Sequence, residues 1–387
     1  MTSSSECLTD MIPASGAAFE RLLPEWRALW SRVTAREPFA HPDWILAYLG
    51  AFEPQASMVV VTARAGDRLS AVLPLIRESA VTDHMRGRWL RAPMNPHVYR
   101  ADILRDPAET RVTPRAMWEA VCACGPWDIF SVPRFARGSF IDELAASAES
   151  SGFPTLLRQD QPTLHVPLPA RDVAVTESPW LATVRSGLQT HIRRSSRQGA
   201  KELGGDLRLD AHETADPALL QRFYEIEASG WKGREGTAIA SAPDTLRFYN
   251  AIARVFAAEK AFTLHLLRVN DRILAGSFGV TVDGCFYPLK WGYDEAYSKY
   301  RPGRVLTAET LRDCWERGIR FFDMGLDEPH KREWTPHVRE HGTLYIFNKN
   351  FYGRLLYGYR GTLGPMFLRA VKRIRGSRAR AGGAGQA

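Results

Sequence analysis

The sequence predicts an α/β protein built from two related units, each a twisted sheet of mixed strand direction flanked by helices (α+β mixed sheets). Helical and strand patterns alternate along the 387 residues, and their order before about residue 165 is partly repeated after it. This length exceeds one ordinary domain. A hydrophobic content of 45%, with 11% aromatic residues, is enough to build two cores.

These patterns divide the chain into four parts. We expect a flexible N-terminus at 1–16, a first domain at 17–165, a second domain at 166–355, and a basic C-terminal helix and tail at 356–387. The first domain is expected to begin with two helices, followed by a hairpin that turns at "AGDR" in "SMVVVTARAGDRLSAVLPLI". A helix, the buried strand "WDIFSVPRF" and a further helix complete it.

The second domain is expected to begin with a basic helix, with Ser178 as N-cap, Pro179 in its first turn and Gly204 as its stop. A strand and two more helices follow. Three strands, "FTLHLLRV", "RILAGSFGVTV" and "CFYPLKWGY", are then separated by the turn pairs Asn270-Asp271 and Asp283-Gly284. The stretch "YSKYRPGRVLTAETLRDCWERG" opens into a helix, and the strand "IRFFDMG" comes after it.

Charged residues are unevenly distributed along the chain. The net charge of +8 favours anionic partners, and the chain has no Asp or Glu after Glu340. We therefore expect the tail either to be solvated or to contact RNA or anionic lipid. The same alternatives apply to the basic helix 185–201. No run is long enough for a transmembrane segment and no leader pattern is present, so a cytoplasmic protein is expected. The five scattered cysteines are expected to be buried thiols and not metal ligands.

The Pro-Gly corner at the start of the helix after "KWGY" has the features of an anion site. The first amides of a helix are not bonded within it, and the helix dipole favours negative charge there. Gly303 permits close approach of a ligand to the backbone, and Arg301 and Arg304 add charge suited to a pyrophosphate. The alternative is an ordinary strand-to-helix connection with two solvent-facing arginines.

Pro288 lies inside the strand that precedes this corner. Proline removes a donor from a strand ladder, so this strand is expected to be interrupted or to part from a neighbour. An extended amide-containing chain such as pantetheine can pair with a parted strand as an added strand would. Together, the parted strand and the anion site predict a binding site for a CoA thioester.

The order of these elements resembles the GNAT acyltransferases, and more closely their BioF2-like or CelD-type branch, relatives of the FemABX aminoacyl transferases with tandem GNAT units. The resemblance covers about residues 35–355 and includes "FAHPDWILAYLGAF", "LQTHIRRSSRQGAKELGG", "FYEIEASGWKG", "KWGYDEAYSKYRPGRVL" and "GIRFFDMGLDEPHKREW". The phosphate loop departs from the family form Q/R-x-x-G-x-G/A. Only Gly303 matches, and Val305 stands where a small residue is usual.

The resemblance implies roles for particular residues. The oxyanion donor is expected to be a backbone amide between Leu289 and Trp291. The donor loop carries Arg301, Gly303, Arg304 and Val305. Acyl transfer to an amine also needs a proton acceptor. The remaining expected site residues are Asp323 or His330 for proton handling, Lys331 for orienting an acidic group, Lys290 and Tyr293 beside the strand, and Trp231 at the acceptor site.

Three of these residues also have a structural explanation. Asp323 is alternatively a turn carboxylate, His330 a surface residue and Trp231 a core aromatic. The sequence "HVREH" fits a zinc-protease pattern, but no acidic ligand follows Glu340 and the next residues are strand-like, so no metal site is expected.

The expected function is that of an N-acyltransferase, with acyl-CoA (acetyl-CoA) as co-substrate and no permanently bound cofactor. The acyl group is expected to move directly to an amine such as an amino sugar or an amino acid. Two alternatives stay open: a FemABX-like transferase fed by aminoacyl-tRNA, and a non-catalytic binding or scaffold protein.

Overall fold

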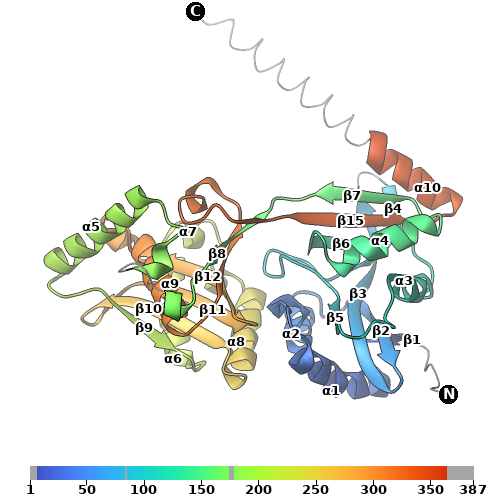
Figure 1. Cartoon of the computed structure of the whole chain (residues 1–387), viewed down its shortest axis with the longest axis horizontal. Helices are drawn as coiled ribbons and strands as arrows, with labels where there is room; N and C mark the ends of the chain where they lie inside the picture. Colours follow the sequence, from blue (N-terminus) through green and yellow to red (C-terminus); the bar gives the residue numbers. More distant parts are fainter. Residues whose placement is uncertain (1–6, 83–84, 174–177, 364–387) are drawn as a thin grey trace, which may run out of the picture. The chain divides into compact units, whose positions relative to one another are not determined.

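The computed structural model describes residues 7–82, 85–173 and 178–363, and these residues form two compact units (Figure 1). The first unit contains residues up to Arg32, 56–160 and those from 342 onward. The second contains 33–55 and 161–341. The sequence predicts two continuous domains, whereas each unit is assembled from separate stretches of the chain.

The segment 33–55 joins the second unit because its apolar face packs there. Its main element is α2 (Pro42–Phe52), and Trp44 is fully buried with edge-to-face contacts to Phe248 and Phe256 of α8 (Pro243–Ala258). The buried His41, which caps α2, also lies 2.9 Å from Glu259 through its Nε2 atom. Aromatic packing of this kind stabilises a contact beyond its buried area.

The first unit is an eight-stranded mixed sheet, ordered β1-β2-β3-β4-β6-β15-β7 with β5 paired to β3. The strands are β1 (Cys7–Pro13), β2 (Ser57–Ala65), β3 (Arg68–Thr82), β4 (Met85–Arg91), β5 (Leu104–Arg105), β6 (Ile129–Ala136), β7 (Thr155–Gln159) and β15 (His341–Phe347). The helices are α1 (Gly16–Arg32), α3 (Pro114–Cys122), α4 (Phe140–Ser150) and α10 (Phe351–Gly358). Helices α3 and α4 pack against each other over a core that includes Trp118 and Phe130 (Figure 1).

One feature of the first unit was predicted from the sequence and another was missed. The hairpin predicted at "AGDR" is confirmed, with Ala65 paired to Arg68 across Gly66 and Asp67. Residues 7–13, expected to be flexible, instead form β1 along β2, because Cys7 and Met11 alternate onto the apolar core. The predicted C-terminal part, 356–387, lies outside the described residues from 364 onward.

The second unit is a seven-stranded mixed sheet in the order β14-β8-β13-β12-β11-β10-β9. The strands are β8 (Thr163–Pro167), β9 (Arg208–His212), β10 (Phe262–Val269), β11 (Arg272–Val282), β12 (Cys285–Tyr293), β13 (Phe321–Leu326) and β14 (Val338–Arg339). The remaining helices are α5 (Ser186–Leu203), α6 (Pro217–Ala228), α7 (Trp231–Arg234) and α9 (Pro302–Glu316). The three predicted strands and both turn pairs between them are confirmed.

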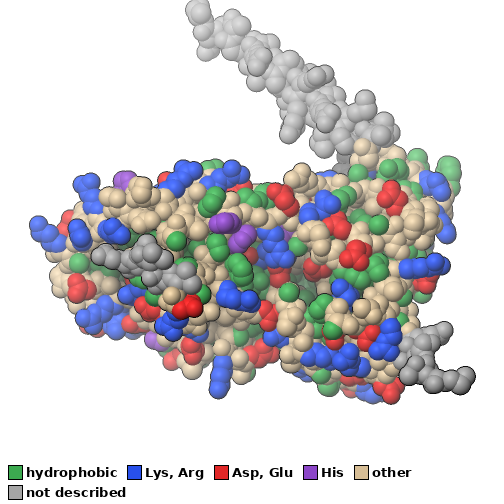
Figure 2. All heavy atoms as spheres, viewed as in Figure 1, with side chains coloured by type: hydrophobic (Ala, Val, Ile, Leu, Met, Phe, Trp, Pro, Cys, Tyr) green, Lys and Arg blue, Asp and Glu red, His purple; other side chains and the backbone are tan. Residues whose placement is uncertain are grey.

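The predicted basic helix is shorter than expected. A 3-10 turn (Pro179–Leu181) is followed by α5, which begins at Ser186, and the Ser178 side chain makes no capping hydrogen bond. Gly204 ends α5 in a left-handed conformation, as predicted. The arginines of α5, including Arg193, Arg194 and Arg197, face solvent (Figure 2). No helix in the described ranges is long and apolar enough to cross a membrane.

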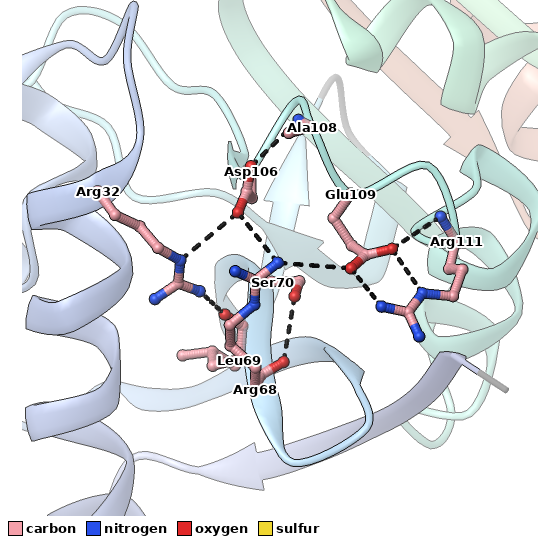
Figure 3. A network of polar contacts seen from close by, with 8 residues as sticks. All are labelled: Arg32, Arg68, Leu69, Ser70, Asp106, Ala108, Glu109 and Arg111. Atoms are coloured by element: carbon pink, nitrogen blue, oxygen red, sulfur yellow. Dashed lines mark hydrogen bonds and ion pairs between the residues drawn. The ribbon is translucent and has the colours of Figure 1, made fainter. Parts of the chain in front are cut away.

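A polar network in the first unit ties the end of α1 to β3 and to the segment after β5 (Figure 3). Arg32 and Arg68 lie 3.5 and 3.6 Å from the Asp106 carboxylate, and Arg68 also lies 3.5 Å from Glu109. Arg111 donates two hydrogen bonds of 2.7 Å to Glu109, which is 5% exposed. These bonds lower the pKa of the Glu109 carboxyl from 4.5 to about 2.

We predict that the Glu109 network stabilises the fold only above acidic pH. Because the folded pKa is depressed, the contribution is complete above about pH 4.5 and is lost as the pH falls towards 2. Denaturant unfolding of wild type and Glu109→Gln should therefore differ at pH 6 and converge towards pH 2. Glu119→Gln is the control, because the Glu119 pair with Arg115 is largely exposed. A constant difference for Glu109→Gln across this range would contradict the prediction.

Candidate functional site

Strands β12 and β13 run parallel but pair over only two residue pairs, Cys285 with Phe321 and Phe286 with Phe322. Beyond these pairs the two strands separate within the described part of the sheet. On its other side, β12 stays paired with β11 as far as Tyr293. The sheet is therefore split along one edge of β12, as the sequence predicts from Pro288.

The cause of the split lies in β12 itself. Pro288 has no N–H to donate, and the ladder with β11 shifts register there, pairing Gly279 with Pro288 but Phe278 with Lys290. Leu289 is thus an extra residue in a β-bulge. The bulge changes which side chains face which side of the sheet, so that Pro288 and Trp291 line one cavity while Lys290 faces the other side.

A cavity of about 480 Å³ opens where the strands part, and the helix α9 forms its other wall. It is lined by residues of β11, β12, α9, β13 and the segment that follows β13. These are Ser277, Pro288, Trp291, Tyr293, Ser298, Arg301, Pro302, Gly303, Arg304, Leu306, Thr307, Thr310, Phe322, Met324, His330, Lys331 and Trp334. We call it the split-strand cavity.

The N-terminus of α9 faces this cavity. The helix begins at Pro302, within the Pro-Gly corner itself, and Arg301 precedes it in a left-handed conformation with φ 50°. The Arg304 amide bonds back to the Arg301 carbonyl at 3.0 Å. A Cβ on Gly303 would meet only the Tyr293 ring, at 3.5 Å, so the absence of a side chain leaves open space beside the helix N-terminus.

The two arginines of this corner differ in their surroundings. Arg304 forms an ion pair of 3.3 Å with Glu333, whereas Arg301 is exposed and has no ion pair within the described residues. A helix N-terminus with an uncompensated arginine beside it attracts an anion. Arg301 is therefore the cation at this corner that is available to a ligand.

Lys331 is a buried lysine on the opposite wall, with a residue exposure of 6%. Its Nζ donates to the Leu326 carbonyl at 3.2 Å, lies 3.5 Å from Glu328, and sits 5.5 Å from the centre of the Trp291 ring. Burial lowers the pKa of Lys331, while the nearby carboxylates of Glu328 and Asp323 oppose this. The side chain of His330 also lines the cavity but is 63% exposed.

Thr310 was not singled out in the sequence. Its hydroxyl is buried in the cavity wall and has no hydrogen-bond partner in the described structure. An unsatisfied buried hydroxyl is costly, so Thr310 is an unusual feature of this wall. Gly303, Thr307 and Thr310 follow one face of α9 at helical spacing, and this pattern could have indicated the cavity-facing side.

The structure brings together most but not all of the predicted site residues. Seven of them line the split-strand cavity: Trp291, Tyr293, Arg301, Gly303, Arg304, His330 and Lys331.

The other predicted residues lie elsewhere. Val305 packs into the core with Leu267 and Ala275, so its bulk does not fill the cavity. Leu289 occupies the bulge, and Lys290 lies over the Tyr249 ring at 5.6 Å, where burial and Lys232 lower its pKa. Trp231 begins α7, but its side chain lies outside the described part.

Asp323 lies in a second cavity, of about 300 Å³, which also receives Tyr287 from β12. We call this the rear cavity. Because strand side chains alternate, Asp323 faces away from Phe322 and Met324, which line the split-strand cavity. One Asp323 oxygen accepts a 2.6 Å bond from the Gly325 amide at a bulge of β13, so the turn-carboxylate explanation applies to that oxygen.

His165 lies in the rear cavity directly across from Asp323 in the β8–β13 ladder. Its Nδ1 atom is buried without a hydrogen-bond partner among the described residues. Burial, followed by the neighbouring His337 ring, lowers the pKa of His165, and the Asp323 carboxylate partly opposes this. The ring is therefore mostly neutral near pH 7. Nothing in "TLHVP" distinguishes this histidine from an ordinary strand residue.

Comparisons with known proteins agree with this geometry. Residues 186–332 match the family model of an acetyltransferase (GNAT) domain, a span that contains β12, β13, α9 and every residue that lines the split-strand cavity except Trp334. No curated protein sequence matches the chain.

Solved structures show the same fold across most of the chain. The crystal structure of FemX matches with a TM-score of 0.58 and 10% identity, covering 87% of this chain and 98% of FemX. The C-terminal domain of a protein described as a lysylphosphatidylglycerol synthetase from Agrobacterium fabrum matches with a TM-score of 0.53 and 12% identity, covering 87% of this chain and 94% of that one. Across most of its length the chain therefore has the fold of FemX, and its segment 186–332 matches a GNAT acetyltransferase domain.

Proposed function

We propose that this GNAT-fold chain is an N-acyltransferase that takes an acyl group, most simply acetyl, from acyl-CoA and transfers it directly to an amine. The observation that carries the proposal is the split-strand cavity, which joins the free edge of β12 to the N-terminus of α9. One end of the cavity suits an extended chain of amides and the other suits a pyrophosphate.

The residues present fit such a donor. The volume of about 480 Å³ lies within the range of small-molecule sites, and the lining combines apolar and aromatic side chains with polar and charged groups. Arg301 supplies an uncompensated charge beside the helix N-terminus. The buried Thr310 hydroxyl lacks a protein partner, which is expected for a group that bonds to a ligand.

On the donor side, we assign three functions to residues of this chain. Arg301 and the open backbone at Gly303 hold the phosphates, and Arg304, which is paired with Glu333, lies beside them. The β12 edge near Trp291 orients the pantetheine chain, although the Trp291 carbonyl already accepts a 2.6 Å bond from Lys232. Lys331 lies on the inner wall, where a protonated ammonium group stabilises negative charge on a thioester oxygen.

On the acceptor side, we assign proton transfer to His165. Tyr287 and Asp323 of the rear cavity immediately follow the last paired residues of β12 and β13, so this cavity reaches the point where the strands part. The amine nitrogen bonds to the acyl carbon and the carbon–sulfur bond breaks, releasing CoA as the thiolate. One N–H proton passes to the neutral His165 ring and on to solvent, and the thiolate takes up a proton from solvent.

Charges in the rear cavity favour a small polar acceptor such as an amino acid or an amino sugar. Arg36 is paired with Asp283 at 3.1 Å, and Arg339 is paired with Glu37. Arg320 has no ion pair in the described part of the chain, and Asp323 presents a carboxylate. An acceptor with its neutral amine beside Asp323 and an anionic group near Arg320 matches this pattern.

The same fold supports a second candidate, an aminoacyl transferase that uses aminoacyl-tRNA. The solvent-facing arginines of α5 favour it, because a row of exposed cations binds a nucleic acid backbone. Direct binding separates this candidate from the acyl-CoA enzyme.

We predict that acetyl-CoA binds the chain and that Arg301→Glu weakens this binding about a hundredfold, by placing a like charge beside the phosphates. Gly303→Ala should weaken it about tenfold, because the new methyl group enters the cavity beside Tyr293, yet leave the melting temperature unchanged or higher. Isothermal titration calorimetry measures both effects.

The control is Arg222→Glu, an exposed arginine on α6 outside both cavities, which should bind acetyl-CoA like wild type. Absence of acetyl-CoA binding by folded wild type, combined with salt-sensitive binding of bulk tRNA, would overturn the acyl-CoA proposal in favour of the aminoacyl transferase. If folded wild type binds neither acetyl-CoA nor tRNA, the result would favour a non-catalytic protein.

The role of His165 predicts a loss of turnover without a loss of donor affinity. With acetyl-CoA and a panel of amino acids and amino sugars, CoA thiol release should fall at least about a hundredfold in His165→Gln, since general-base catalysis contributes about this much. Acetyl-CoA binding should be unchanged. Cys285→Ser is the matched control from the same cavity and should retain turnover, because direct transfer needs no acyl-cysteine. Full activity of His165→Gln would remove His165 from the mechanism.

A further inference from the structure

The positive charge of the chain is concentrated at its C-terminal end. Nine Lys and Arg residues and no Asp or Glu follow Glu340, which leaves 42 Lys and Arg against 43 Asp and Glu in the preceding residues. The net charge of +8 therefore comes from the last part of the sequence. An excess of this kind attracts an anionic surface.

Exposed apolar side chains gather in the same part of the chain, on α10. Phe351 is 85% exposed and Leu355, one helical turn later, is 48% exposed. Tyr352 and Tyr357 are 36% and 38% exposed. Hydrophobic and basic side chains lie next to each other over the visible part of α10 (Figure 2). We call Phe351, Tyr352, Leu355 and Tyr357 the α10 patch.

The patch is held on the first unit by the opposite face of the helix. Leu356 is buried with Trp89 and Phe347, and the Tyr357 ring contacts Phe347 edge-on at 5.6 Å. The Asn350 side chain caps α10 by accepting a 2.8 Å bond from the Gly353 amide. Phe351 and Leu355 are therefore presented outward on a helix that is already anchored.

Cations flank the patch. Lys349 precedes the helix and Arg354 lies within it, and neither forms an ion pair in the described part of the chain. Six further cations follow residue 363 in the sequence, where Phe367, Leu368, Val371 and Ile374 are interspersed with them. On α10, aromatic and aliphatic residues beside Lys and Arg have the composition of a helix that lies in a membrane interface.

We propose that the α10 patch docks on the surface of an anionic lipid bilayer, with the positive charge of this part of the sequence adding to the attraction. Attraction of the cations to acidic headgroups brings the chain to the surface, and insertion of Phe351 and Leu355 into the interface adds apolar burial. Nucleic acid would use the cations but would gain little from an exposed leucine. The patch therefore favours lipid. This surface belongs to the first unit and is independent of the proposed acyl transfer.

Co-sedimentation of the full chain with phospholipid vesicles tests this. Vesicles that contain phosphatidylglycerol should bind the chain, vesicles of phosphatidylcholine alone should bind it far more weakly, and added salt should release it. The double substitution Phe351→Ser with Leu355→Ser should weaken binding at least about tenfold, since each side chain loses apolar burial.

Two controls make the test specific. Leu8→Ser with Val81→Ser removes two equally exposed apolar side chains outside α10 and should bind vesicles like wild type. Melting temperatures of both double variants establish that they fold. No binding of wild type to phosphatidylglycerol vesicles would overturn the proposal, as would equal binding to both vesicle types. Binding of bulk tRNA that survives loss of the patch, without vesicle binding, would assign the cations to nucleic acid.

Discussion

The functional architecture of the second unit depends on the limited pairing of β12 with β13. Two residue pairs hold the strands together, and Pro288 with the bulge at Leu289 prevents the ladder from continuing. Parallel strands in a sheet core normally remain paired, because buried backbone groups need hydrogen bonds. Here the break leaves backbone groups and a volume of about 480 Å³ beside the N-terminus of α9.

The same break relates the two cavities. Residues on one face of the strands, such as Phe322 and Met324, line the split-strand cavity, while Tyr287 and Asp323 face the rear cavity. A donor in the first and an acceptor in the second would approach each other from opposite faces at the last paired residues. Each set of side chains follows from strand alternation and from the one bulge in β12.

The local features of the fold could be predicted from sequence, and long-range associations could not. The turn pairs, Gly204 and the interruption at Pro288 each follow from backbone chemistry of one or two residues. The assignment of 33–55 to the second unit depends on Trp44 meeting Phe248 and Phe256, some 200 residues away, and no local pattern encodes that contact. The N-terminal strand β1 was missed because seven residues with mixed polarity give a weak signal.

The site shows the same division between local and long-range information. Gly303 and Arg301 lie at a helix start that the sequence marks with Pro-Gly, whereas His165 enters from β8 and meets Asp323 only through strand pairing. Val305 was expected at the donor because it occupies the last position of the loop motif, but helical geometry turns it into the core.

The central claim is that an acyl-CoA donor binds along the free edge of β12 and the N-terminus of α9. Amide hydrogen exchange with and without acetyl-CoA tests it most directly. The account predicts slower exchange, on adding acetyl-CoA, at the amides of Trp291, Tyr293 and Gly303. Binding of acetyl-CoA that leaves these amides unchanged and slows exchange only in other segments would contradict it.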